Sequence, residues 1–356
     1  MKKCKLFLLM LTLVALGAGI TSAQTKSRGA TRRTPSQTAS TTPTAAPIAL
    51  WINFNGGEDV RSLAHDDKNV YITMNYTRRM VIIEKATGRL SEIRHDNDIW
   101  SVVVADNKCY YTVVGEGLFA YDPVSGKSEG PVFGIDGFSE GVGKGLAVSP
   151  DGNYLMCNEC VVDVRAGKIV NIPGEGRTIG INNVGGAYIA VPEPDYCDLE
   201  GERYSISTKA VVHAIYPDAV TGNTFWCCEQ GVGFTDMVPA PESGIRRVAI
   251  PGINDPYVVP HDITRDDEGN FVITTNKGII FGGKTLDDNA VLVDNLKTGV
   301  KNQYGTELTL NYFGGLVDSD GIGNIIFGSD SYACICIYNP KGLKGYTEIR
   351  GKAVRF

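Results

Sequence analysis

A short signature of turn residues followed by strand residues returns seven times after residue 60, and it constrains the fold more than any other feature. The clearest copies, at 151–155, 266–272 and 320–326, place aspartate, glycine and asparagine before apolar residues. Aligned on one turn position, successive copies lie 39, 45, 33, 37, 47 and 54 residues apart, at Asn69, Lys108, Asn153, Gly186, Asn223, Asn270 and Asn324. A period near 40 residues, built from short strands and tight turns, is typical of a β-propeller blade.

Strand-length runs rich in β-branched and aromatic residues fill the intervals, for example at 70–74, 80–83 and 335–338. No stretch after residue 48 sustains helical periodicity. We therefore predict an all-β fold, a seven-bladed β-propeller over residues 49–356 with four strands in each blade. Closing the ring needs an outer strand from one end of the chain, and either 50–54 or 353–356 is able to supply it.

The first 48 residues differ in composition from the rest. Residues 1–23 combine Lys2, Lys3 and Lys5, an apolar run from 6 to 20 and small residues, which is the pattern of a secretory signal peptide. Residues 24–48 are rich in Thr, Ser, Ala and Pro, so they predict a disordered linker that cannot bury enough apolar surface to fold. We expect an exported bacterial protein, periplasmic or extracellular, with no transmembrane segment once the signal is removed.

Charge excludes one class of partner. Seven of the 34 basic residues precede residue 49 while all 40 acidic residues follow it, so residues 49–356 carry a formal charge of −13. Nucleic-acid binding depends on a basic surface, and we expect none here.

Eight cysteines follow the predicted signal. Cys157 and Cys160 flank the two residues Asn158 and Glu159, so they are able to pair across a hairpin. An even count in an exported chain permits disulfides, although buried thiols are the alternative for most of these residues.

The segment 263–279 resembles a blade of the two-component-regulator propeller repeats. Residues 260–263 running into Gly269 and Asn270 are also similar to the streptogramin-lyase and NHL-type propellers. The resemblance covers the third, sixth and seventh copies well. It implies the propeller fold, which sensors, binding modules and some enzymes share.

Counting back from each turn to the start of the innermost strand identifies a candidate ligand-binding ring. In a propeller these starting residues face the mouth of the central channel. His261 lies nine residues before Asn270, and equivalent counting selects Arg61, Trp100, Lys144, Arg177 and His213. Such cationic and hydrogen-bonding side chains on an acidic body predict a site for an anion or a carboxylate. The alternative is that they neutralise nearby acidic loops.

A second hypothesis joins His213, His261 and Glu229 as ligands of a divalent metal, because the segment 225–231 resembles a streptogramin-lyase blade. That family pairs its glutamate with a histidine two positions later, where this chain has Gly231. The long segment 192–204 predicts a loop on the same face, suited to a lid or a partner contact.

We therefore expect a monomeric, non-enzymatic binding module without a required cofactor. It should recognise a small ligand, an anionic glycan or peptide, or a protein partner on its channel face. The alternative is a metal-dependent lyase or a glycan-active hydrolase.

Overall fold

The computed structural model describes residues 46–136, 145–157, 160–171, 178–181, 187–193, 196–201, 204–207, 212–228, 231–236, 246–248, 257–286, 290–310 and 313–356. The predictions for residues 1–23 and for nearly all of 24–48 lie outside these ranges. Within the described residues every regular element is a β-strand, and no helix is long and apolar enough to cross a membrane.

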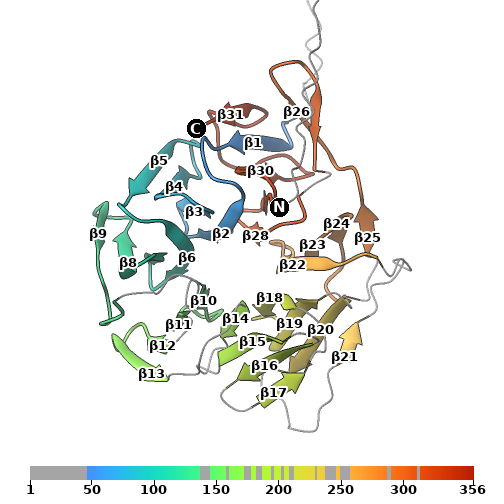
Figure 1. The fold of residues 1–356 in the computed structure, drawn as a ribbon. Coiled ribbons are helices and arrows are strands. Elements are labelled where there is room, and N and C mark those ends of the chain that lie inside the picture. Colours follow the sequence, from blue (N-terminus) through green and yellow to red (C-terminus); the bar gives the residue numbers. More distant parts are fainter. Residues whose placement is uncertain are drawn as a thin grey trace, which may run out of the picture. The chain divides into compact units, whose positions relative to one another are not determined.

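Six sheets have four antiparallel strands in chain order, and we number them blades 1 to 6 (Figure 1). Blade 1 contains β2 (Val60–His65), β3 (Asn69–Met74), β4 (Arg79–Glu84) and β5 (Leu90–Arg94). Blade 2 contains β6 (Ile99–Ala105), β7 (Lys108–Val113), β8 (Gly117–Asp122) and β9 (Lys127–Glu129). Blade 3 contains β10 (Leu146–Val148), β11 (Tyr154–Cys157), β12 (Cys160–Asp163) and β13 (Lys168–Asn171).

The remaining regular blades follow the same order. Blade 4 contains β14 (Thr178–Ile181), β15 (Ala187–Glu193), β16 (Tyr196–Gly201) and β17 (Tyr204–Ser207). Blade 5 contains β18 (Val212–Pro217), β19 (Asn223–Cys228), β20 (Gly231–Asp236) and β21 (Arg246–Val248). Blade 6 contains β22 (Pro260–Arg265), β23 (Phe271–Thr275), β24 (Gly278–Phe281) and β25 (Val291–Val293).

A five-stranded sheet, the closing sheet, combines both ends of the described chain. Its order is β28 (Val317–Ser319), β29 (Ile325–Gly328), β30 (Cys334–Tyr338), β1 (Ala49–Asn53) and β31 (Ala353–Arg355). Strand β1 pairs antiparallel with β30 and parallel with β31. A separate hairpin, β26 (Lys297–Lys301) and β27 (Glu307–Thr309), precedes this sheet.

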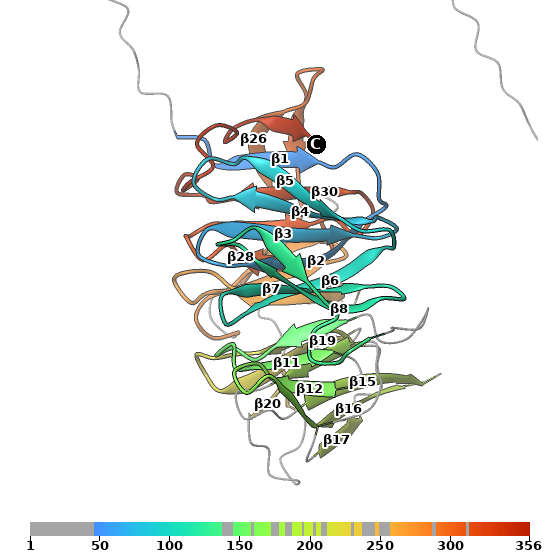
Figure 2. The same cartoon turned by 90° about the vertical axis from the view of Figure 1, so that its left-hand side faces the viewer.

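The sheets contact one another in a ring through their innermost strands, β2, β6, β10, β14, β18, β22 and β28 (Figure 1). Figure 2 shows the same ring of sheets from the side. The all-β propeller fold is thus confirmed. The expectation of seven regular four-stranded blades is wrong, because six sheets have that form and both terminal strands join one larger sheet.

The repeated aspartates of the sequence signature cap the turns that end the innermost strands. Asp266 Oδ1 accepts the backbone N–H groups of Glu268 and Asn270 at 2.9 and 2.8 Å, and its Oδ2 accepts the Asn270 amide at 3.0 Å. Asp320 makes the same bonds to Ile322 and Asn324. These side chains satisfy turn N–H groups that no ladder partner reaches, which explains why the signature recurs.

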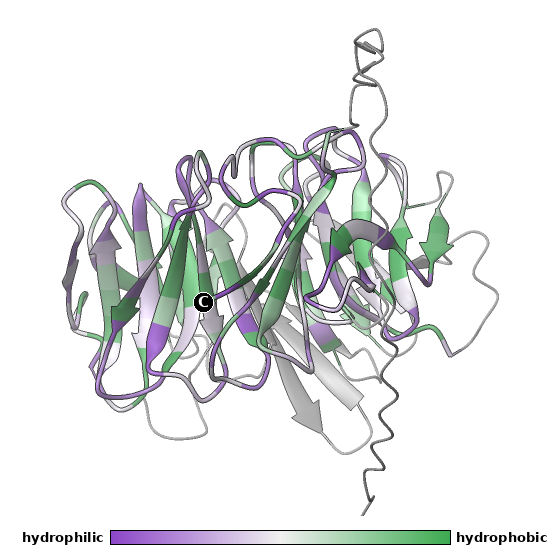
Figure 3. Cartoon of the chain, turned by 90° about the horizontal axis from the view of Figure 1, so that it is seen from above, coloured by the Kyte–Doolittle hydropathy of each residue, from purple (hydrophilic) through white to green (hydrophobic). Residues whose placement is uncertain are grey.

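The hydrophobic core is divided among the interfaces between neighbouring sheets. Among the described residues, the clusters of buried side chains draw on neighbouring sheets: for example, Val70 and Ile72 of blade 1 pack with Ile335 and Ile337 of the closing sheet. Apolar residues concentrate on the strands and polar ones on the turns (Figure 3). Burial on both faces accounts for the runs of consecutive apolar residues in strands such as β3 and β4.

The segment 192–204, expected to be a loop, instead contributes strands. Strand β15 extends to Glu193 and β16 begins at Tyr196, and the ladder pairs Pro192 with Cys197. Most of this segment therefore belongs to the second and third strands of blade 4 rather than to a long excursion from the sheet.

Candidate functional site

Four innermost strands are irregular at the residues that the sequence places at the mouth of the channel. The ladder between β2 and β3 shifts register between Val60 and Ser62, leaving Arg61 without an opposite residue. The same shift leaves out His213 in β18 and His261 in β22. In β6 the shift lies between Ile99 and Val102, at Trp100 and Ser101. Bulges of this kind bend a strand and redirect its side chains, and they are frequent next to functional sites.

Bulged residues from three of these four strands meet in one pocket of about 260 Å³, which we call the mouth pocket. Arg61, Trp100 and His213 line it together with Gly145 and other residues of the inner strands. The Arg61 guanidinium lies 4.7 Å from the centroid of the Trp100 ring, a cation–π distance. Partial burial lowers the pKa of Arg61 and Asp59 opposes this, but a guanidinium stays charged in proteins.

His261 borders the same site by way of His213. The two imidazole rings lie 5.1 Å apart between centroids and are tilted by 53°. His261 Nδ1 lies 2.5 Å from the carbonyl oxygen of Gly314. Because a carbonyl only accepts, Nδ1 carries the hydrogen, and this bond fixes the ring beside His213.

Hydrogen bonds between neighbouring sheets connect residues that line the mouth pocket. The Ser62 hydroxyl accepts the Val102 N–H at 3.1 Å, and the Ser101 hydroxyl accepts the Leu146 N–H at 3.1 Å. Asp262 Oδ2 accepts the Val317 N–H at 2.9 Å. Each acceptor belongs to a bulge of one blade and each donor to the next inner strand, so the bulges also hold neighbouring sheets in register.

Asp262 stands where blades 1 and 2 have serine, and it places an acid at the floor of the mouth pocket. Burial raises the pKa of Asp262 to about 7, and the nearby Asp318 carboxylate adds to the effect. Burial also raises the pKa of Asp318, although His65 and Lys85 oppose the shift. The site thus combines the exposed side chains of Arg61 and His213 with the half-buried carboxyl groups of Asp262 and Asp318.

A second cavity, of about 560 Å³, continues the mouth pocket into the channel. It shares Leu63, Leu146, Asp262, Val317 and Asp318 with the mouth pocket. Its other lining residues lie at the opposite ends of the inner strands and include His65, Thr264 and Tyr216. A third cleft, of about 860 Å³, lies elsewhere, between the closing sheet and the β26–β27 hairpin, and contains none of the predicted ring residues.

The structure brings four of the six predicted ligand-binding residues together: Arg61, Trp100, His213 and His261. Lys144 and Arg177 lie outside the described residues, although Gly145, the neighbour of Lys144, lines the mouth pocket. That these side chains bind a ligand stays a prediction.

The predicted metal site is only partly described. Glu229 lies outside the described residues, so its position beside His213 and His261 stays a prediction. Among the residues that are described, no three acidic, histidine or cysteine side chains gather in a metal-binding cluster.

The sequence interpretation missed Asp262, Asp318, Ser62 and Ser101. Each lies within three positions of a predicted ring residue or its equivalent in the closing sheet, Gly315. A polar residue directly follows each of Arg61, Trp100 and His261, and this pattern could have identified Ser62, Ser101 and Asp262 from the sequence.

Comparison of the fold with solved structures finds similar propellers. The extracellular domain of BT3049 from B. thetaiotaomicron, assigned to a hybrid two component system, has a TM-score of 0.57 and 14% identity over 83% of this chain and 41% of that one. The corresponding domain of BT4673 from B. thetaiotaomicron has a TM-score of 0.56 and 14% identity, over 84% and 40%. The WD40 propeller domain of Doa1 has a TM-score of 0.54 and 14% identity, over 83% and 97%.

These similarities define the class of protein as a β-propeller. The chain spans about 40% of the length of the BT4673 and BT3049 structures. No family description matches the chain, and no curated protein matches its sequence. The resemblance to streptogramin-lyase and NHL-type repeats therefore stays a prediction.

Proposed function

We propose that this protein is an exported β-propeller that binds an anionic ligand, such as an acidic glycan or peptide, at the mouth pocket. The observation that carries the proposal is the set of bulges at Arg61, Trp100, His213 and His261, which gather four scattered side chains at one end of the channel. Export is supported by the basic, apolar and small-residue pattern of residues 1–23. The extracellular origin of two similar propellers agrees with this compartment.

The distribution of charge decides where the anion binds. Arg61 supplies a permanent positive charge at the rim, and the two histidines add hydrogen-bond donors. Burial raises the pKa of Asp262 and of Asp318, which reduces their negative charge and leaves Arg61 as the dominant charge in the mouth pocket. We therefore expect the anionic group to stay at the rim against Arg61, while neutral parts of the ligand occupy the channel.

Binding measurements on purified protein test this function. A panel of acidic oligosaccharides and acidic peptides is titrated calorimetrically into the wild type, Arg61→Ala and His213→Ala. Removing Arg61 should weaken binding by about 1.5–3 kcal/mol, the usual contribution of a charge-assisted hydrogen bond. Arg89→Ala is the matched control. Arg89 forms an ion pair of 3.1 Å with Glu84 and does not line the mouth pocket, so this variant should leave the affinity unchanged.

Equal weakening by the Arg61 and Arg89 variants would refute the mouth pocket as the site. The competing hypothesis of a metal-dependent lyase makes a different prediction, because it requires the adjacent imidazoles of His213 and His261 to bind a metal ion. Stoichiometric divalent metal in the purified protein, lost in His213→Ala and His261→Ala, would favour the lyase over the binding module.

A further inference from the structure

Cys157 and Cys160 face each other at the end of the β11–β12 hairpin in blade 3. They form the last residue pair of the ladder before the turn. Their sulfur atoms lie 3.1 Å apart, and both side chains are buried. The pair is therefore held together by the hairpin itself, whatever its redox state.

We propose that Cys157 and Cys160 are a disulfide site that closes this hairpin in the exported protein. Opposite residues of an antiparallel ladder have Cα atoms about 4.5–5.5 Å apart, within the range of about 4.4–6.8 Å that disulfides span. The two sulfurs need to approach by only about 1 Å to reach the bonded distance. No rearrangement of the sheet is required.

The other described cysteine side chains are placed differently. Cys334 and Cys336 lie on one face of the same strand, where a spacing of two residues separates their Cα atoms by about 7 Å. Cys227 and Cys228 are consecutive, so they point to opposite faces of β19. Cys109 contacts the sulfur of Met80 at 3.7 Å. These five thiols serve as internal controls.

The oxidation is a thiol–disulfide exchange with a small disulfide such as oxidised glutathione. The thiolate of one cysteine attacks a glutathione sulfur and releases one glutathione thiolate, forming a mixed disulfide. The second cysteine thiolate attacks the protein sulfur of that mixed disulfide and releases the second glutathione thiolate. Two protein thiols and one oxidised glutathione thus give one protein disulfide and two reduced glutathiones.

The position of the pair links it to the candidate ligand site. Cys157 is paired with Leu146 of β10, and Leu146 lines both channel cavities. The Leu146 N–H is also the group bound by the Ser101 hydroxyl of blade 2. A covalent link at Cys157 therefore fixes the strand that directly supports this part of the mouth pocket.

Differential alkylation of the full chain tests the site without any substitution. Because both thiols are buried in the folded protein, the reduced and denatured chain is refolded in oxidised glutathione. It is then denatured in iodoacetamide, reduced, labelled with N-ethylmaleimide and analysed by peptide mass spectrometry. We expect N-ethylmaleimide on Cys157 and Cys160, and iodoacetamide on the five control thiols. Iodoacetamide on both Cys157 and Cys160, or a bond from either to another cysteine such as Cys197, overturns the proposal.

Thermal unfolding provides an independent measurement. Cross-linking so short a loop removes little entropy from the unfolded chain, so reductant should lower the Tm of the oxidised protein by only about 3 °C. The double variant Cys157→Ala/Cys160→Ala should show no fall, whereas Cys334→Ala/Cys336→Ala should retain it. An equal fall in the first double variant would assign the effect to other cysteines and overturn the proposal.

Discussion

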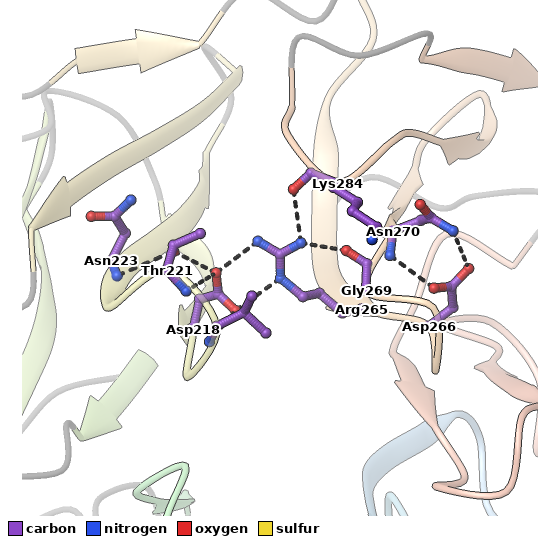
Figure 4. A network of polar contacts seen from close by, with 9 residues as sticks. Asp218, Thr221, Asn223, Arg265, Asp266, Gly269, Asn270 and Lys284 are labelled. Carbon is purple, nitrogen blue, oxygen red and sulfur yellow. Dashed lines mark hydrogen bonds and ion pairs between the residues drawn. The ribbon is translucent and has the colours of Figure 1, made fainter.

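Arg265 connects blades 5 and 6 through a buried ion pair with Asp218 (Figure 4). Its Nε and Nη2 donate to the two carboxylate oxygens of Asp218 at 2.8 and 2.7 Å. The guanidinium also lies 3.7 Å from the Phe271 ring centroid and donates to the Lys284 carbonyl. Burial acts to raise the pKa of Asp218, but hydrogen bonds from Arg265 and Thr221 outweigh it, so this pKa is lowered.

Replacing Arg265 by alanine should lower the free energy of unfolding by about 3–5 kcal/mol, because Asp218 would remain buried without its partner. Urea denaturation at neutral pH measures the effect. The exposed pair of Lys341 and Glu268 gives the control, and Lys341→Ala should cause no measurable loss. Equal losses in the two variants would show that burial does not determine the contribution of these pairs.

Asp262 should make stability depend on pH between about 4 and 8. Its pKa is about 7 in the folded protein and near the ordinary aspartate value in the unfolded chain, so the folded state holds the extra proton in this interval. The stabilisation is complete below the unfolded pKa and is lost as pH rises through the folded value. Urea denaturation across this range should show the decline in the wild type. Asp262→Asn keeps an acceptor for Val317 and should show a shallower decline, because Asp318, whose pKa is also raised, remains. Parallel curves for the two proteins would exclude Asp262 as a source of the pH dependence.

The sequence identified pocket residues correctly in those inner strands where a similar number of residues separates the turn from the mouth pocket. Arg61, Trp100, His213 and His261 were reached by counting back along inner strands of similar length. Asp262 was missed because strand alternation places it on the opposite side from His261. The bulge cancels that alternation, and a bulge depends on pairing between strands that local sequence does not reveal.

Strand β1 is the element on which ring closure depends. It lies between β30 and β31, its Leu50 and Ile52 side chains are fully buried, and it pairs with the C-terminal strand. The sequence showed that either terminus was able to supply a closing strand. It did not show that both do so. Whether the N-terminal or the C-terminal strand pairs with β30 depends on how the side chains pack in the assembled ring, which local sequence does not reveal.

Removing β1 should therefore abolish cooperative folding. A chain that begins at Phe54 exposes the edge of β30 and the core cluster around Ile335, whereas a chain that begins at Ala46 retains every strand. Circular dichroism during heating should show a sharp transition only for the longer chain. A matching transition in the shorter chain would mean that the ring closes without β1.

At the scale of the whole molecule, the core is distributed over the interfaces between sheets. Unfolding blade 1, blade 2, blade 6 or the closing sheet therefore exposes two clusters, one on each side. We expect residues 46–356 to unfold in a single transition, with a calorimetric enthalpy close to the van't Hoff enthalpy. Two resolved transitions in differential scanning calorimetry would instead identify groups of blades that fold separately.

The inner strands have their two kinds of special residue at opposite ends. The aspartate-capped turns close the far ends, at Asp66, Asp218, Asp266 and Asp320 among others, while the bulges lie at the beginnings. A mutation at Arg61 or His213 thus leaves the turn bonds intact. Substitutions at the bulges can therefore change ligand specificity one blade at a time while the turns that stabilise the ring stay the same. Related propellers can differ in specificity and keep the same fold.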